Sequence, residues 1–210
     1  MKNNKQLLAN ALIEICNIKP LDKITVTEIT KKAGLTRQVF YHHFLDKYEL
    51  AKWVHMQDFI QHVKATTLEN NGEMYLEEIM LEWLLTLEKH KVFYRNTYHS
   101  LEAKEFQMMI CNHVYESYKQ IVLSTTQKPL SEETNFILQI YCIGACQKCF
   151  DWIIAGCEIH PKVICKWMFN ALPQDLQKSI VNYKISKKEV IQMTKYVAYQ
   201  SEVDKKSYMA

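Results

Sequence analysis

The sequence predicts an all-α protein in which a small three-helix domain precedes a larger helical bundle. Only four glycines and four prolines occur among 210 residues, which is too few for the many turns of a strand-rich fold. No stretch alternates apolar and polar residues in the way that a half-buried strand requires. Apolar residues instead recur every three or four positions, as Leu8, Leu12 and Ile15 do. Together these observations favour helices throughout.

Each helix is predicted from such an apolar stripe and from the residues that end it. Leu76, Trp83 and Leu87 belong to a second stripe, for example, and Gly156 and Pro161 separate two strongly apolar segments. The predicted helices are 3–18, 26–33, 37–43, 47–70, 74–89, 91–98, 102–124, 132–155, 161–171 and 175–182, followed by a weaker one at 187–200.

The composition excludes several classes of protein. Hydrophobic residues make up 48% of the chain and aromatic residues 11%, enough to bury a core, so most of the chain is not expected to be disordered. The longest apolar stretch, at about 136–154, contains Gln139, Lys148 and Asp151, and we therefore expect no membrane span. The seven cysteines are odd in number and no secretory signal is visible, which predicts reduced thiols and a cytoplasmic location.

The sequence also lacks the motifs of common enzymes. It contains no glycine-rich phosphate loop, no Gly-x-Ser-x-Gly elbow and no His-Glu-x-x-His motif. We therefore expect no catalysis and no cofactor.

The positive charge of the chain is concentrated at its N-terminus. Residues 1–50 contain eight basic and five acidic residues, whereas the rest of the chain contains 18 of each. A small basic segment on a neutral body suggests that this segment binds a polyanion.

Residues 21–50 contain the start and stop signals of two short helices. Thr25 followed by Glu28 fits a capping box, in which each side chain bonds the backbone amide of the other residue. Gly34 suits the left-handed residue that ends a helix, and Thr36 suits the N-cap of the next one. Asp46, three residues before Glu49, signals the start of a long helix. Two short helices joined by a turn of about three residues are the sequence form of a helix-turn-helix.

The second short helix is predicted to expose a polar face. This face contains Arg37, Gln38, Tyr41 and His42, whereas Ile29, Leu35, Val39, Phe40 and Phe44 are the predicted core. Arginine pairs well with guanine and glutamine with adenine, while Thr36, Tyr41 and Lys47 are suited to bind phosphate. The alternative is an ordinary helical hairpin with a solvated face.

Residues 24–50, which read ITVTEITKKAGLTRQVFYHHFLDKYEL, resemble the N-terminal domain of TetR/AcrR-type bacterial transcriptional regulators. The matching features are Thr25-Val26, the turn from Ala33 to Thr36, and the run from Phe40 to Phe44 followed by Asp46-Lys47. The preceding helix fits as well, so the resemblance covers about residues 3–50. In the C-terminal part, Phe150 to Ile153 and Gly156 resemble the subgroup that contains regulators of dihydroxyacetone kinase.

This resemblance implies a homodimer that binds a palindromic operator in double-stranded DNA. It implies residues 1–50 as the DNA-binding domain, 51–183 as the effector-binding and dimerisation domain, and 184–210 as a C-terminal extension. Family members often repress until an effector binds, so a repressor is expected, although some members of the subgroup activate with a partner protein. The implied base-proximal residues are Thr36, Arg37 and Gln38; those at the groove edge or backbone are Tyr41, His42 and Lys47; and Thr25 and Thr27 face phosphate.

The two apolar helices at 132–172 are expected to form the dimer interface as half of a four-helix bundle. Gly144 lies in mid-helix, where it costs roughly 1 kcal/mol relative to alanine, and a close helix–helix approach would explain it. The candidate interface residues are Gly144, Trp152, Ile153, Trp167, Met168 and Phe169. The alternative is that the large residues belong to the core of one chain.

Candidate ligand-binding residues come from the middle helices, where aromatic and methionine side chains with a few polar tips suit a pocket. They are Trp83, Tyr94, Tyr98, His99, Met108, His113, Tyr115, Tyr118 and Tyr141. The alternative for each of them is a place in the core. A further alternative is a helical regulator that binds a protein partner and no small ligand.

Cys142, Cys146 and Cys149 share one stripe of a predicted helix. They suggest a metal or redox sensor as another alternative, but the stripe spreads the sulfurs along about 10 Å, too far for all three to reach one ion. Small buried side chains are the simpler interpretation, and no metal site is predicted. His55 and His62 are expected to be partly exposed.

Overall fold

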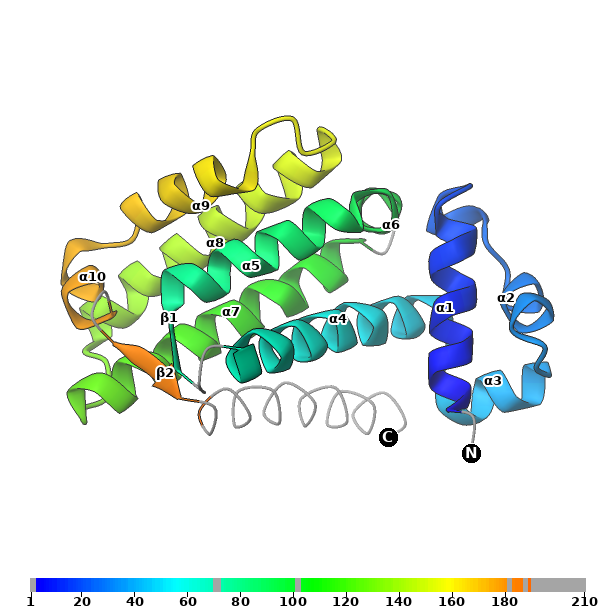
Figure 1. Ribbon diagram of the computed structural model, residues 1–210, viewed down its shortest axis with the longest axis horizontal. Helices are drawn as coiled ribbons and strands as arrows, with labels where there is room; N and C mark the ends of the chain where they lie inside the picture. The colour runs from blue at the N-terminus through cyan, green and yellow to red at the C-terminus, as the bar shows by residue number, and fades with distance from the viewer. Residues whose placement is uncertain (1–2, 70–72, 101–102, 181–182, 187–188, 190–210) are drawn as a thin grey trace.

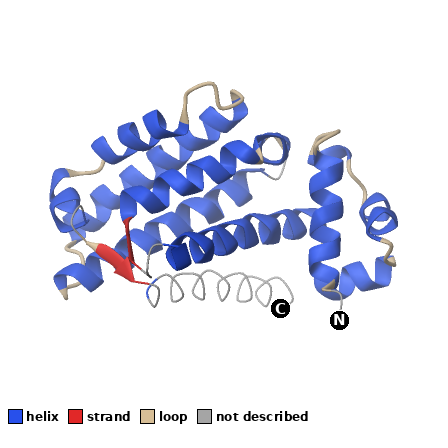
Figure 2. Cartoon of the chain, viewed as in Figure 1, coloured by secondary structure: helices blue, strands red, loops and turns tan. Residues whose placement is uncertain are grey.

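The computed structural model describes residues 3–69, 73–100, 103–180, 183–186 and 189, and these ranges are almost entirely helical (Figures 1 and 2). The elements are α1 (Asn4–Cys16), the 3₁₀ turn η1 (Leu21–Lys23), α2 (Val26–Ala33), α3 (Arg37–His43), α4 (Lys47–Glu69), β1 (Glu73–Tyr75), α5 (Leu76–Lys89), α6 (Lys91–Tyr98), α7 (Ala103–Thr126), α8 (Glu132–Ile154), α9 (Pro161–Asn170), α10 (Gln174–Ile180) and β2 (Lys184–Ser186). The all-α prediction is confirmed. The weaker helix predicted at 187–200 lies, except for residue 189, outside the described residues.

The helices α1, α2 and α3 form a small unit at one end of the molecule, which we call the head (Figure 1). The remaining elements form the body. Helix α4 starts at the head, where it packs against α1, and runs along the body against α5. In the body, α5 packs against α9, α7 packs against α8 and α10, and the short α6 touches α1, α7 and α8.

The predicted capping signals of the head are confirmed. The amide of Glu28 donates to Thr25 Oγ1 at 3.2 Å, and the amide of Thr25 donates to the Glu28 carboxylate at 2.9 Å. Gly34 adopts φ +67°, a conformation that glycine reaches without the steric cost of a Cβ. Thr36 accepts from the amide of Val39 at 3.3 Å. Local sequence therefore fixes both helices and the angle at which the chain turns between them.

A two-stranded antiparallel sheet was not predicted from the sequence. Glu73 pairs with Ser186, Met74 with Ile185 and Tyr75 with Lys184, so the predicted helix at 74–89 begins two residues later, after a strand. The strands have three residues each, too few to show a period in the sequence. The first residues of the predicted extension 184–210 thus pair with the body.

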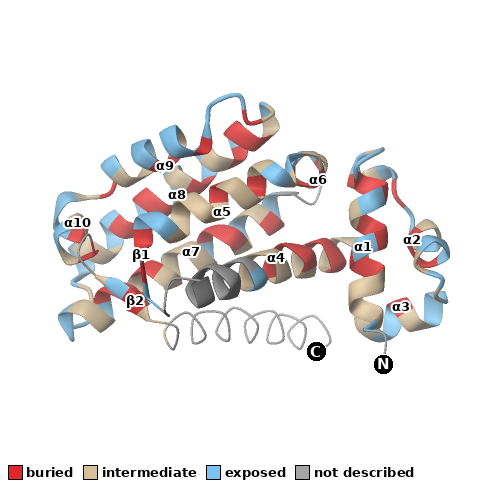
Figure 3. Ribbon diagram, in the orientation of Figure 1, coloured by how far each residue is buried: buried red, intermediate tan, exposed pale blue. Residues whose placement is uncertain are grey.

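One apolar core continues from the head into the body. Leu12 of α1, Phe40 of α3, Leu50 of α4 and Phe150 of α8 belong to the same buried cluster. A second cluster, which includes Leu138 and Ile185, fills the far end of the body. Figure 3 shows buried residues along the facing sides of the helices. Because the core is continuous, the head is packed against the body and not simply tethered to it.

Candidate nucleic-acid interface

The predicted polar face of α3 points to solvent. Thr36, Arg37, Gln38, Tyr41 and His42 are all exposed. The Arg37 guanidinium lies 5.8 Å from the centre of the Tyr41 ring, which leaves the two side chains together on the outer surface of the helix. The face is therefore available to a partner.

The opposite face of α3 anchors the helix. Phe40 is fully buried, Phe44 is 2% exposed and Ile29 of α2 is fully buried beneath them. The two phenylalanine rings lie 5.9 Å apart. Leu35 is half-buried and packs against the same cluster, and Val39 is half-buried as well. Four of the five predicted core residues thus belong to the buried cluster or pack against it, and α3 is held with its polar side outward.

The beginning of α2 is held by the side chain of Glu28. Its carboxylate accepts from Lys19 Nζ at 2.6 Å and from the Thr25 hydroxyl at 2.9 Å, in addition to the amide of the capping box. The bond from Lys19, followed by those from Thr25, lowers the pKa of Glu28 to about 2. Thr25 and Thr27 are exposed beside this network, and the Thr25 hydroxyl already serves it.

Lys47 is predicted to bind DNA phosphate, and the structure gives it a second role. Its ammonium donates to the carbonyl oxygens of Asp22 at 2.9 Å and of Ile24 at 2.8 Å. Burial lowers the pKa of Lys47, although Asp22 and Asp46 oppose the shift. The residue therefore joins the start of α4 to the loop before α2.

The head is also attached to the body through α6. The side-chain amide of Asn96 donates to the carbonyl oxygen of Cys16 at the end of α1, at 2.6 Å. On the same helix, the Tyr94 hydroxyl donates to Asp58 of α4 at 2.8 Å. His90, the residue just before α6, places its Nδ1 3.1 Å from the same carboxylate oxygen. Helix α6 therefore contacts both the head and the interior of the body.

Three of the predicted ligand residues lie in one aromatic cluster of the body. We use the name aromatic node for His55, Trp83, Tyr94, Tyr98 and Phe106. The His55 ring lies 5.2 Å from Trp83, 5.7 Å from Tyr94 and 5.5 Å from Phe106, always edge to face. The expectation of a partly exposed His55 was wrong, because rings from three other helices cover it and leave it 5% exposed. Burial lowers the pKa of His55 to about 3. The side chain of His62 lies outside the described residues.

The other predicted ligand residues lie elsewhere. The hydroxyls of Tyr118 and Tyr141 face each other at 3.5 Å in the second core cluster, and Tyr115 bonds Asn135. His99 is exposed, Met108 is 50% exposed and His113 is half-buried. The nine residues therefore form no single pocket.

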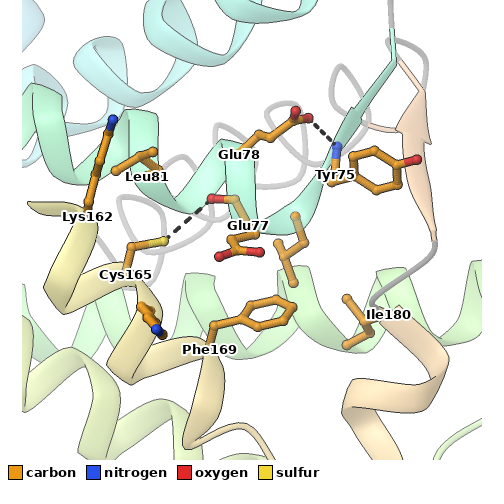
Figure 4. A pocket seen from close by; sticks show the side chains of 10 residues that line it. Tyr75, Glu77, Glu78, Leu81, Lys162, Cys165, Phe169 and Ile180 are labelled. Atoms are coloured by element: carbon orange, nitrogen blue, oxygen red, sulfur yellow. Dashed lines mark hydrogen bonds between the residues drawn. The ribbon is translucent and has the colours of Figure 1, made fainter.

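The described part of the body has a surface groove of about 530 Å³ between α5 and α9 (Figure 4). Its walls carry Lys162 and Lys166 from α9 and Glu77 and Glu78 from α5. In Figure 4 the Cys165 thiol points across the groove to the carbonyl oxygen of Glu77, at 3.6 Å. None of the nine predicted ligand residues lines this groove.

Two of the predicted dimer residues belong to the core of one chain. Trp152 is 5% exposed and Ile153 is fully buried, so their side chains offer almost no surface to a second copy. The Trp152 indole also donates to the carbonyl oxygen of Ile159 at 2.8 Å. Trp167, by contrast, is 55% exposed, and Gly144 is exposed with open space where a Cβ would be. Met168 and Phe169 are half-buried.

The most exposed apolar residues of α8 were not predicted from the sequence. Phe136, Ile140 and Ile143 are 64%, 58% and 56% exposed. We call them the α8 stripe, since their spacing of four and three residues places them on one side of the helix. That spacing was visible in the sequence. Because α8 carries apolar residues on several sides, however, the helical spacing of its apolar residues alone did not distinguish the buried side from the exposed side.

The cysteines are free thiols, and six of the seven are buried. Among the residues that the structure describes, no three histidine, cysteine or acidic side chains are grouped so that they could hold a metal ion. Within the same residues, no helix is both long enough and apolar enough to cross a membrane.

Comparisons with known proteins agree with this architecture. Residues 11–54 match the family model described as bacterial regulatory proteins of the tetR family, and residues 75–174 match the model described as a transcriptional regulator C-terminal region. Over 95 residues the chain is 25% identical to the HTH-type dhaKLM operon transcriptional activator DhaS of Lactococcus lactis subsp. lactis. That alignment covers 45% of this chain and 48% of DhaS, so it spans about half the length of this curated relative.

Solved structures share the fold over a longer range. The dihydroxyacetone kinase operon activator DhaS superposes with a TM-score of 0.61 at 19% identity, covering 88% of this chain and 100% of the other. A tetR-family transcriptional regulator from Streptomyces coelicolor superposes with a TM-score of 0.53 at 14% identity, covering 100% and 98% of the two chains. In both cases the likeness is one of fold.

Proposed function

Because the chain belongs to the TetR family of transcriptional regulators, we propose that it binds a palindromic DNA operator as a homodimer and acts in the cytoplasm. The observation that carries this proposal is the outward polar face of α3, which is held by a buried aromatic anchor. A helix of this kind fits the major groove, and two copies related by a twofold axis would read the two half-sites.

We assign the contacts by chemistry and exposure. Arg37 and Gln38 are exposed near the beginning of α3 and would contact base edges, with Thr36 beside them. Tyr41 and His42 lie about one turn later and would contact the groove edge. Thr25, Thr27 and Lys47 would contact phosphate, which positions the head without selecting sequence.

The homodimer is proposed to form through the α8 stripe and Trp167. These four large apolar side chains are more than half exposed in the single chain, and exposed apolar groups of this size on neighbouring helices are typical of an interface. Helices α8 and α9 are joined by a bond from the Tyr141 hydroxyl to the carbonyl oxygen of Met168, at 2.9 Å. Large aromatic residues usually carry most of the binding energy of such a surface.

A small effector is proposed to bind at the aromatic node. Within the described residues, His55 Nδ1 is a buried polar atom that lacks a hydrogen-bond partner, and such an atom normally costs about 1–3 kcal/mol. An effector that forms the missing hydrogen bond to His55 Nδ1 would favour the conformation of the body in which it binds. A panel of small metabolites can be tested for compounds that raise the melting temperature of wild type but not of His55→Phe. If no compound in the panel had this effect, regulation by a protein partner would be favoured over regulation by a small effector.

The protein could either repress or activate transcription of its target genes, and we propose both as candidates. Repression is the first, and it follows from the common behaviour that the family resemblance implies. Activation is the second, and it is favoured by the relative DhaS, which is named a transcriptional activator. A reporter placed under the chain's own upstream region decides between them, because loss of a repressor raises its output and loss of an activator lowers it.

The DNA-binding proposal can be tested by fluorescence anisotropy with duplexes from that upstream region, measured over a range of salt concentrations. We expect specific binding that weakens steeply with salt, because phosphate contacts release counterions. Arg37→Ala should weaken operator binding by about 1–3 kcal/mol. The matched control is Lys128→Ala, an exposed charge in the α7–α8 connection at the far end from the head (Figure 1), and it should bind like wild type. Equal binding by both variants would contradict the assignment.

A further inference from the structure

The groove between α5 and α9 has an apolar floor. Leu76, Cys165 and Ile180 line it and are buried, and Phe169 adds a half-buried ring. The Cys165 thiol donates to the carbonyl oxygen of Glu77 at 3.6 Å, and burial raises the pKa of this thiol to about 11. The thiol is therefore protonated at neutral pH. The floor carries no charge and suits an apolar group.

The two walls of the groove carry opposite charges. Lys162 and Lys166 are four residues apart on α9, so they lie one turn apart on the same side of the helix. Glu77 belongs to the first turn of α5, on the other wall. In Figure 4 its side chain is directed towards Cys165 and Phe169, and hence into the groove.

The charges on the two walls are not paired. Among the residues that the structure describes, no ion pair joins Lys162, Lys166 or Glu77 to any other side chain, and all three are exposed. Glu78, the next acid on α5, is already used, because its carboxylate accepts from the amide of Tyr75 at 2.8 Å. Within the described part of the chain, the groove therefore presents two unpaired ammonium groups and one unpaired carboxylate across an apolar floor.

We propose that this groove binds a small apolar zwitterion, namely an apolar amino acid or a dipeptide made of such residues. The carboxylate of the ligand accepts hydrogen bonds from Lys162 and Lys166, and its ammonium donates to Glu77. Its apolar side chain lies on Leu76 and Phe169. The groove volume of about 530 Å³ is ordinary for a small-molecule site.

Opposite charges on facing walls give the groove its selectivity. A ligand with only a carboxylate leaves Glu77 unpaired, and a ligand with only an amine leaves both lysines unpaired. The site is separate from the effector site proposed at the aromatic node, since no residue of the node lines the groove. The proposal therefore rests neither on the node nor on DNA binding.

Isothermal titration calorimetry of the full chain tests the site with leucine, phenylalanine and leucyl-leucine, which also distinguish an amino acid from a dipeptide. At least one of them should bind. Isocaproate, which lacks the amine of leucine, and isoamylamine, which lacks its carboxylate, should bind more weakly by about tenfold, because each loses the charged hydrogen bonds to one wall.

Variants of the two walls test the assigned contacts. Glu77→Gln and the double variant Lys162→Gln/Lys166→Gln should each weaken the zwitterion by about fivefold or more, since each removes the charge of one wall. All three positions are exposed, so the fold should be retained, and circular dichroism checks this. The matched control is Lys178→Gln on α10, which removes an exposed lysine that does not line the groove, and it should bind like wild type.

The proposal would be overturned if none of the three zwitterions bound, if the single-charge analogues bound as tightly, or if the wall variants bound like wild type. His55→Phe removes the polar atom of the aromatic node and should leave binding at the groove unchanged. Loss of binding in His55→Phe, with the wall variants unaffected, would place the ligand in the node and overturn the groove as its site.

Discussion

Replacing Lys47 with methionine removes the ammonium but keeps most of the aliphatic chain, so it tests the two hydrogen bonds that join α4 to the loop before α2. The Lys47 ammonium donates to the carbonyl oxygens of Asp22 and Ile24 at 2.9 and 2.8 Å. A hydrogen bond to a charged group contributes about 1.5–3 kcal/mol when it is buried. Lys47 is only half-buried, so we reduce the sum for solvent screening and expect Lys47→Met to lose about 2–4 kcal/mol. In a chain of this length the melting temperature should fall by on the order of 10 °C.

The assay is thermal and urea unfolding followed by far-ultraviolet circular dichroism. Lys23→Met is the matched control, since it removes an exposed lysine from the same loop, and it should change stability by less than about 0.5 kcal/mol. At a temperature where Lys47→Met is folded, the salt dependence of DNA binding should also decrease by about one unit of slope if the residue contacts phosphate. If Lys47→Met had the same melting temperature and the same urea midpoint as wild type, the structural role that we assign to this lysine would be refuted.

Ile140→Asp should convert the proposed dimer to a monomer in analytical ultracentrifugation, while Asn112→Asp, at an exposed position on α7, should not; a monomeric wild type would contradict the proposed interface. Glu28 has a pKa of about 2 in the folded chain and an ordinary value of 4.5, so its stabilisation is present above pH 4.5 and lost as the pH falls towards 2. The stability difference between wild type and Glu28→Gln in urea should shrink over that range, and a constant difference would contradict it. Asn96→Ala should loosen the end of α1, so hydrogen exchange relative to wild type should become faster in the head than in the body. If the head of the variant exchanged as slowly as that of wild type, this attachment would be excluded.

The head could be derived from sequence almost completely because its determinants are local. Thr25, Glu28, Gly34 and Thr36 act on residues within four positions of themselves, and the structure shows each of them in the predicted role. The exposed face of α3 follows from the same signals, since they fix where the helix begins. Bonds between residues distant in sequence were not visible, among them those of Lys47 to the loop before α2, which span more than twenty positions.

The body was less predictable because its contacts join distant segments. The strands pair Glu73 with Ser186, and neither strand is long enough to signal itself. The aromatic residues of the middle helices gave no sign of which cluster each would join, so nine ligand candidates were divided between two cores and the surface. Trp152 and Trp167 have the same residue type and nearly the same apolar surroundings in sequence, yet one is core and the other is exposed.

The most direct test of the central claim is a scan of every base pair in one operator half-site with wild type and Arg37→Ala. We expect wild type to discriminate sharply at the one base pair that Arg37 contacts, and Arg37→Ala to lose this preference while its preferences at other base pairs remain. Identical base preferences in the two proteins would contradict the claim that the outer face of α3 reads DNA.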